Sequence, residues 1–326
     1  MKLTADFESW PLLEPFETSQ EVLQTVDMVF VTLTDAAGYR GRAEAIGVSD
    51  HGETPQQVLE ELRAFAPRIT ADFDREALAG MLGPGGARNA LDCALWDLEA
   101  KRAGRRVWDL TGSGAPKPLM TAATIGLGGL DQIAARARRA AGLPLVKIKL
   151  DAERHLEVVR LVRSLAPSSR LIVDANQAWS RALLETLLPE LQQLGVELVE
   201  QPVPIGQDET LRGLRSPLPI AADESAADRA SLAALDGLYQ AINIKLDKTG
   251  GLTEALAMAH QAQAMGLDLM VGCMCGTSLG MAAAWPVAMR CRWIDLDGPL
   301  LLARDRDTRL VIDGGVMQPP SKELWG

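Results

Sequence analysis

The chain has 326 residues, of which 47% are hydrophobic and 23% are charged, a balance typical of a globular protein with an ample core rather than of a disordered or fibrous chain. Its net charge of −10 and its pI near 5.0 argue against a surface for nucleic acid or anionic membrane, since either would need a basic patch. Small molecules are therefore the expected partners.

The opening residues lack the apolar core of a secretory signal, and no apolar run is long enough to cross a bilayer. The four cysteines show no zinc-binding spacing, and we expect them to be small apolar core residues in a reducing compartment. These are Cys93, Cys273, Cys275 and Cys291. A cytoplasmic protein is therefore expected. The sequence leaves the oligomeric state open, a homo-oligomer included.

Residues 1–115 predict a small α+β domain, because strand patterns come first and helical patterns follow. The alternating run Met28–Thr34 and the following Tyr39–Gly47 indicate an antiparallel hairpin. Helices are predicted over Thr54–Phe65 and Arg88–Ala103, the second with one apolar stripe.

Residues 116–302 show short β-forming runs that alternate with helical sequence. The charged residues that end five of these runs are separated by 25, 26, 23 and 22 residues, which indicates a chain of βα units. Met120–Gly126 is the first of eight strand candidates, while Asp151 and Ser180 are expected to cap the helices that follow them. Eight strands predict a closed parallel barrel of the (β/α)₈ type, and so an α/β fold.

Residues 303–326 form a C-terminal segment that the barrel does not need. Within it, Thr308–Gly315 looks like a strand and a turn. We expect this segment to return to the N-terminal domain.

Five consecutive strand candidates end on charged residues, namely Lys149, Asp174, Glu200, Asp223 and Lys245. The carboxyl ends of parallel barrel strands open onto one face, so these side chains should converge around one mouth. Three carboxylates there make an oxygen-only site that suits Mg²⁺. Structural ion pairs between the acids and the lysines are the alternative.

This arrangement favours proton transfer next to a carboxylate. A cation bound to a substrate carboxylate stabilises the negative charge that develops when the α-proton leaves. A lysine beside a divalent cation and a second ammonium group has a reason to lose its proton near neutral pH and to act as a base. Lys147 is the candidate for that second ammonium, with a supporting role as the alternative. Two opposed lysines, Lys149 and Lys245, would take a proton from one face and return one to the other, which is racemisation or epimerisation.

Five short motifs resemble those of the enolase superfamily and, within it, of the muconate-cycloisomerase-like subgroup with its lysine-x-lysine motif. They are Lys147-Ile-Lys149, Asp174-Ala-Asn176, Glu200-Gln-Pro202, Asp223-Glu-Ser225 and Ile244-Lys245. The resemblance covers nearly the whole chain and implies a capping domain, a modified TIM-type barrel of the (β/α)₇β kind and a tail. It implies Asp174, Glu200 and Asp223 as Mg²⁺ ligands and the lysines Lys149 and Lys245 as the acid/base pair.

The eighth strand candidate points to one activity within the subgroup. Asp295-Leu-Asp297 looks like the aspartate-x-aspartate motif of dipeptide epimerases, which resembles a clamp for the free α-ammonium group of the substrate. Residues two apart on a strand share a side, so both carboxylates could bind a cation at the end of the ligand away from the metal. An ordinary turn with solvated charges is the alternative.

The resemblance therefore implies an isomerase, a Mg²⁺-dependent dipeptide epimerase in which two lysines move an α-proton through a metal-stabilised enediolate. Asp295, Asp297 and Lys147 would contact the substrate. The alternatives are β-elimination or cycloisomerisation, as in o-succinylbenzoate synthase or muconate cycloisomerase, and a binding protein that has lost its chemistry.

Two capping loops depart from the family pattern. Many alanyl-glutamate epimerases carry an arginine in the first loop, and often another before a Gly-Glu-Thr turn. Here Pro15–Glu21 and Ser49–Gly52 contain no arginine, and they include the acidic Glu17 and Asp50. This favours a neutral or cationic second residue of the dipeptide rather than glutamate. Gly276 also stands where several subgroup members place a glutamate.

Overall fold

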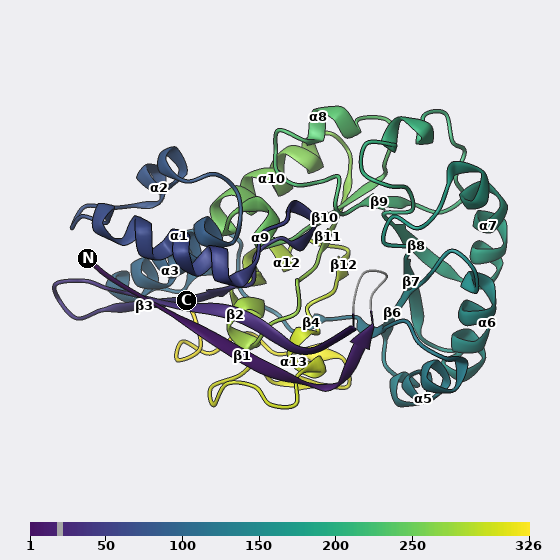
Figure 1. Cartoon of the computed structure of the whole chain (residues 1–326), viewed down its shortest axis with the longest axis horizontal. Coiled ribbons are helices and arrows are strands. Elements are labelled where there is room, and N and C mark those ends of the chain that lie inside the picture. The colour runs from purple at the N-terminus through teal and green to yellow at the C-terminus, as the bar shows by residue number, and fades with distance from the viewer. Residues whose placement is uncertain (18–21) are drawn as a thin grey trace.

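The computed structural model of the chain describes residues 1–17 and 22–326. Of the predicted first capping loop, Pro15–Glu21, residues 18–21 lie outside the described residues. Both chain ends lie on the side of the N-terminal domain (Figure 1).

An antiparallel sheet in the order β1-β2-β3 builds the N-terminal domain, and it contains the predicted hairpin. One face of β2 is buried through alternate apolar residues such as Val29, Val31 and Leu33, and it packs on helix α3. Both predicted helices form, and Thr54 caps the first in a capping box with Gln57. The elements are β1 (Lys2–Glu17), β2 (Val22–Thr34), β3 (Arg40–Ala45), α1 (Pro55–Phe65), α2 (Arg75–Met81), α3 (Gly86–Ala103) and α4 (Val107–Leu110).

Eight parallel strands follow, and each pairs with its neighbours in chain order. A hydrogen bond of 2.7 Å from the Ala122 amide to the Ile294 carbonyl joins the two ends of this sheet. The strands are β5 (Ala123–Ile125), β6 (Leu145–Lys149), β7 (Arg170–Asp174), β8 (Val196–Glu200), β9 (Ile220–Ala222), β10 (Ala241–Ile244), β11 (Asp268–Val271) and β12 (Trp293–Ile294).

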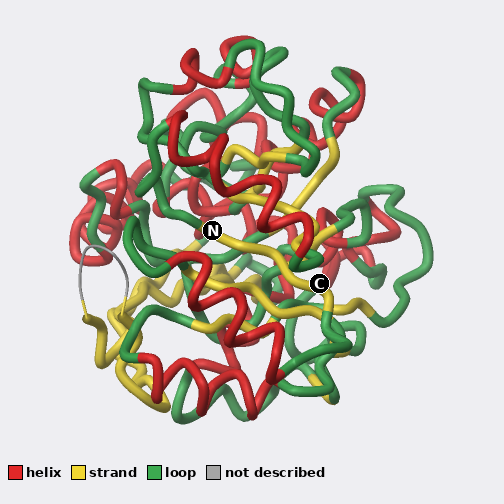
Figure 2. The backbone as a smooth tube through the Cα atoms, turned by 90° about the vertical axis from the view of Figure 1, so that its right-hand side faces the viewer, coloured by secondary structure: helices red, strands yellow, loops and turns green. Residues whose placement is uncertain are grey.

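Helices cover the outside of this sheet, and Figure 2 shows them in front of the strands. The helices of this part of the chain are α5 (Leu130–Ala140), α6 (His155–Leu165), α7 (Arg181–Gln193), α8 (Leu232–Leu235), α9 (Leu246–Thr249), α10 (Leu252–Ala264), α11 (Ser278–Ala283), α12 (Trp285–Ala288) and α13 (Gly298–Leu301). Of these, α11 contacts the capping strand β3 and α13 contacts β1. Between β8 and β9 the described chain forms only a 3₁₀ turn, Asp208–Leu211. No helix of the described residues has the length and apolar character needed to cross a membrane.

A separate apolar cluster fills the interior of the barrel, with one side chain contributed by each strand or by the residue directly before it. These floor residues are Ala122, Leu145, Ile172, Leu198, Ala221, Ala241, Met270 and Trp293. The cluster confirms the predicted barrel. Because strand side chains alternate, the residues two positions further along each strand also point inward, nearer the mouth.

Two local predictions are wrong. Met120–Gly126 is not one strand, because Met120 pairs with the tail in β4 (Leu119–Met120) and only Ala123–Ile125 enters the barrel as β5. Asp151 is not the N-cap of α6. Its carboxylate accepts hydrogen bonds from the amides of Glu153 and Arg154, which closes a turn before the helix begins at His155. Ser180 does cap α7.

The tail forms a hairpin, β13 (Ile312–Asp313) and β14 (Val316–Met317), that pairs with β4 rather than with the capping sheet. The last residues reach the N-terminal domain, where the Trp325 indole donates to the Cys93 carbonyl over 3.2 Å and the Gly326 amide donates to Asp97 over 2.7 Å.

Candidate active site

The mouth of the barrel is lined by the residues that follow the apolar floor by two positions, and seven of these eight are polar. They are Thr124, Lys147, Asp174, Glu200, Asp223, Asn243, Gly272 and Asp295. Two positions further on come Lys149, Lys245 and Asp297. The alternation of the strands thus brings the predicted site residues to one end of the barrel. Five of them, Lys147, Lys149, Lys245, Asp295 and Asp297, line a cavity of about 180 Å³, and the three predicted metal ligands are paired with these lysines.

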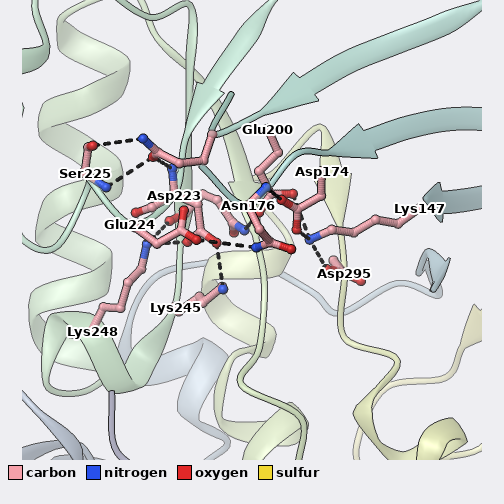
Figure 3. A network of polar contacts seen from close by, with 12 residues as sticks. Lys147, Asp174, Asn176, Glu200, Asp223, Glu224, Ser225, Lys245, Lys248 and Asp295 are labelled. Carbon is pink, nitrogen blue, oxygen red and sulfur yellow. Dashed lines mark hydrogen bonds and ion pairs between the residues drawn. The ribbon is translucent and has the colours of Figure 1, made fainter. Parts of the chain in front are cut away.

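Lys147 connects three carboxylates from different strands. Its Nζ lies 3.0 Å from Asp174 Oδ2, 2.8 Å from Glu200 Oε2 and 2.8 Å from Asp295 Oδ2. Its side chain is only 3% exposed, so the group is removed from solvent. Figure 3 shows this lysine on one side of the acids, with Lys245 and Lys248 on another.

Asp223 is held by the lysines of that other side. Lys245 Nζ lies 2.7 Å from Asp223 Oδ2, and Lys248 Nζ lies 2.6 Å from Oδ1. Lys149 approaches from β6, 3.2 Å from Asp174 Oδ2 and 2.8 Å from Asn176 Oδ1. Because β6 and β10 are four strands apart in a barrel of eight, Lys149 and Lys245 lie across the mouth from each other.

These charges set one another's protonation. Burial alone would lower the pKa of Lys147, but the surrounding carboxylates outweigh it and raise that pKa well above its usual value. The same balance raises the pKa of Lys245 beside Asp223. Burial and the neighbouring Asp174 raise the pKa of Glu200 to about 8, whereas Lys147 overcomes burial at Asp174 and lowers the pKa of that carboxyl to about 2. Paired with the carboxylates in this way, Lys147 and Lys245 are protonated counter-ions of the acids.

The acids fit a hard divalent cation by the chemistry of their donor atoms. The described residues contain no three acidic, cysteine or histidine side chains already converged on one metal position, and the Lys147 ammonium lies between Asp174 and Glu200. Glu200 Oε2 and Asp223 Oδ2 are nevertheless buried and accept no well-aligned hydrogen bond, although an ammonium lies 2.8 and 2.7 Å away. Carboxylate oxygens of this kind are the ligands that Mg²⁺ prefers.

The predicted aspartate pair lies beside this cluster, directly after β12. Asp295 Oδ1 accepts from the Thr124 hydroxyl over 3.3 Å, and Asp297 Oδ2 accepts from the Thr124 amide over 2.6 Å. Both side chains are buried, which excludes the alternative of a solvated turn. Burial and the nearby Asp295 raise the pKa of Asp297 to about 7.

Comparison with known proteins assigns the chain to a family. Residues 130–323 match the enolase C-terminal domain-like family, and residues 2–112 match the N-terminal domain of mandelate racemase and muconate lactonizing enzyme. The chain belongs to the mandelate racemase/muconate lactonizing enzyme family.

Two curated relatives illustrate the activities found in this family. The L-Ala-D/L-Glu epimerase of Escherichia coli is 41% identical over 310 residues, covering 94% of this chain and 96% of that protein. The L-Lys-D/L-Arg epimerase of Methylococcus capsulatus is 34% identical over 335 residues and covers 94% and 91%. These relatives are named for second residues of opposite charge.

Solved structures of the family show the same architecture. An enolase family member from Agrobacterium tumefaciens, with bound sodium and L-Ala-L-Glu, superimposes with a TM-score of 0.94 at 44% identity over 99% of both chains. The dipeptide epimerase of M. capsulatus, complexed with Mg and L-Arg-D-Lys, gives a TM-score of 0.88 at 32% identity over 98% and 97%.

The departure at Gly276 has a steric reason in this family member. A Cβ on Gly276 would lie 3.0 Å from Oε1 of Glu44, a residue of the capping strand β3. Glu44 accepts from the Thr277 amide over 2.7 Å and pairs with Arg306 of the tail over 2.8 Å. The capping sheet therefore supplies a carboxylate at this loop. Sequence reasoning missed Glu44 and Arg306, because no local pattern relates residues so far apart.

Asn243 and Lys248 also complete the site. Asn243 Nδ2 donates to Glu200 Oε1 over 2.7 Å, and a Cβ at Gly272 would lie 2.8 Å from that amide. Asn243 was detectable as a polar residue two positions before Lys245 in an otherwise apolar strand. Lys248 is buried, where it also donates to the Asn243 carbonyl over 3.0 Å.

Loops at the mouth complete the pocket wall. Ser49 and Asp50 line it, as do Cys273 and Cys275, which also pack against the apolar core as expected for free cysteines. Cys275 has a φ of 68°, one of four positive-φ residues other than glycine in the described chain, all of which follow strand ends at the mouth. Burial raises the pKa of its thiol to about 12, so it stays protonated.

Proposed function

We propose that this chain is a Mg²⁺-dependent dipeptide epimerase that inverts the α-carbon of the second residue. The observation that carries the proposal is the placement of Lys149 and Lys245 on opposite sides of the buried acids. Asp297, at the end of a third strand, gives the substrate a fixed direction in the mouth.

The cation would be held by Asp174, Glu200 and Asp223. When bound, it would stabilise the negative charge that develops on the substrate carboxylate. Acids engaged in this way no longer hold the protons of the neighbouring lysines. Lys149 and Lys245, which are 16% and 15% exposed, then face the substrate as a base and an acid.

The lysines divide the reaction between two faces of one carbon. One lysine Nζ takes the α-proton, and the Nζ across the mouth delivers a proton to the opposite face, which inverts the centre. Asp297, held by the Thr124 amide, pairs with the α-ammonium group of the first residue. In an o-succinylbenzoate synthase or a muconate cycloisomerase this carboxylate would have no cation to bind.

A neutral or cationic second residue is part of the proposal. No arginine is found among the described residues that line the mouth, and Asp50 lies at its wall. The relatives named for acidic and for basic residues show that family membership alone does not set this preference. A cytoplasmic location, favoured by four cysteines that form no disulfide, belongs to the same proposal.

Proton exchange in deuterated water, with Mg²⁺ and a dipeptide library, tests the function. Deuterium at the α-carbon of the second residue, together with inversion, is the expected result. Lys149→Met and Lys245→Met should each lower turnover by about 10²- to 10⁴-fold. Unchanged turnover in both variants would refute the catalytic assignment, and loss of water from the substrate would favour a lyase. A clear preference for glutamate as the second residue would overturn the specificity proposal alone.

A further inference from the structure

A second cavity of about 200 Å³ adjoins the active-site cavity. It lies between helix α5, the end of β1 and helix α13, and we refer to it as the α5 cavity. The two cavities share four lining residues, Phe16, Thr124, Asp297 and Leu301. The two cavities therefore adjoin one another at these residues, Asp297 among them.

The wall of the α5 cavity is mainly apolar. Its aliphatic side chains are Leu13, Ile125, Ala140, Leu143, Leu300 and Leu301. An engineered apolar cavity of about 150 Å³ holds benzene, so this space has room for an aliphatic or aromatic side chain.

The charged residues of the α5 cavity other than Asp297, which it shares with the mouth, are paired with one another. Glu14 forms ion pairs with Arg139 and, over 3.5 Å, with Arg136. Arg136 also donates to the Leu127 carbonyl over 2.8 Å. No lysine is found among the described residues that line this space, so it differs in chemistry from the mouth. Away from Asp297, it offers a ligand apolar contact rather than an unpaired charge.

We propose that the α5 cavity receives the side chain of the first residue of the dipeptide and selects a large apolar side chain there. This inference rests on the proposed function. The first residue carries its ammonium group and its side chain on the same carbon, so an ammonium at Asp297 places that side chain at the junction of the cavities. The second residue then extends toward Lys149 and Lys245, away from the α5 cavity.

The size of the cavity makes the preference measurable. A methyl group would leave most of the apolar wall without contact, whereas a leucine or phenylalanine side chain would cover it. Leu13 and Leu300 at the rim are 68% and 43% exposed, so an occupant would also shield them. One methylene group in a hydrophobic pocket changes kcat/KM by about 10- to 200-fold at most. We therefore expect a large apolar first residue to raise kcat/KM by about 10-fold or more over glycine.

The first test uses the full-length protein with Mg²⁺ and keeps the second residue fixed at the best one in the library. Dipeptides headed by glycine, alanine, leucine and phenylalanine are compared by kcat/KM for α-proton exchange. We expect the leucine and phenylalanine heads to exceed glycine by about 10-fold or more. Equal or higher values for glycine and alanine heads would overturn the inference and leave the proposed function intact. Absence of exchange with every dipeptide would instead refute the proposed function.

Variants locate the preference in the α5 cavity. Leu143→Trp should fill it and lower the ratio of leucine-headed to alanine-headed kcat/KM by about 10-fold. Arg138→Trp, at an exposed position of the same helix, is the control and should leave that ratio unchanged. If Leu143→Trp does not fold, Leu300→Lys places a charge at the exposed rim and should lower the same ratio. An unchanged ratio in the folded variants would overturn the assignment to this cavity.

Discussion

Replacing Lys147 by methionine would test whether this lysine acts as the counter-ion of the acid cluster. The ammonium is buried within 3.0 Å of Asp174, Glu200 and Asp295. Without it, the three carboxylates lose their common cation while they remain out of solvent. Removing one partner of a buried charge network costs about 3–5 kcal/mol, so the free energy of unfolding should fall by that amount in the absence of divalent cation.

Magnesium should then stabilise the variant more than the wild type. A cation that binds only the folded protein adds about 2.7 kcal/mol at 100 times its Kd. In the wild type it must displace the Lys147 ammonium from Asp174 and Glu200, whereas in Lys147→Met those oxygens are available. The shift in Tm on adding Mg²⁺ should therefore be several degrees larger for the variant.

Thermal unfolding with EDTA and with a Mg²⁺ titration measures both effects without any turnover. Lys117→Met, at an exposed position, is the matched control and should unfold like the wild type under both conditions. The reasoning is refuted if Lys147→Met is as stable as the wild type in EDTA, or if Mg²⁺ raises the Tm of both proteins equally.

Three further predictions concern other parts of the molecule. Arg306→Met should lower the free energy of unfolding by about 3 kcal/mol, measured in urea, because it leaves the buried Glu44 carboxylate without its ion-pair partner. Arg304→Met, at an exposed position, is the control and should not cause this loss. Burial raises the pKa of Asp247 to about 6, so the folded state holds a proton that the unfolded state loses above pH 4. The free energy of unfolding therefore falls as pH rises from 4 to 6. In Asp247→Asn this fall should be smaller by about 1–3 kcal/mol, which unfolding experiments at both pH values would measure. The pKa of Asp297 is raised to about 7, so kcat/KM should increase as pH rises through 7 and this carboxylate loses its proton. Asp297→Asn should remove this rise and lower kcat/KM by about 10-fold or more. A variant that keeps the rise, or that loses less activity than this, contradicts the role of Asp297 as the ammonium clamp.

The strand period explains how much of the site could be predicted. Charged residues at the ends of apolar runs indicated both the barrel and the convergence of the acids, because parallel strands open onto one face. The pairing of Lys147 with Asp295 was not predictable, since it joins the second and the eighth barrel strands across the interior. Nor was the hydrogen bond from the Thr277 amide to Glu44 predictable, because it depends on how the capping sheet sits over the barrel.

Local chemistry accounts for the errors as well. The same feature that makes aspartate a good helix cap, a short side chain that accepts from nearby amides, allows Asp151 to close a turn one step before the helix. Likewise the run that begins at Met120 has the composition of a strand, and Met120 does lie in one, but it pairs with Val316 in the tail. Composition alone does not say which strand will be the partner.

Depth in the barrel divides the four lysines of the site into two pairs. Lys147 and Lys248 are each 3% exposed, and each donates to carboxylates or carbonyls on several sides. Lys147 lines the active-site cavity, but its ammonium is paired with three acids, so we expect it to stabilise them rather than to move a proton. Lys149 and Lys245 lie at 16% and 15%, at the mouth, with part of the side chain facing the cavity. In the proposed mechanism, the two-residue step between Lys147 and Lys149 on β6 would separate a counter-ion of the acids from a base, and the opposition of Lys149 to Lys245 would direct the two lysines at opposite faces of one carbon.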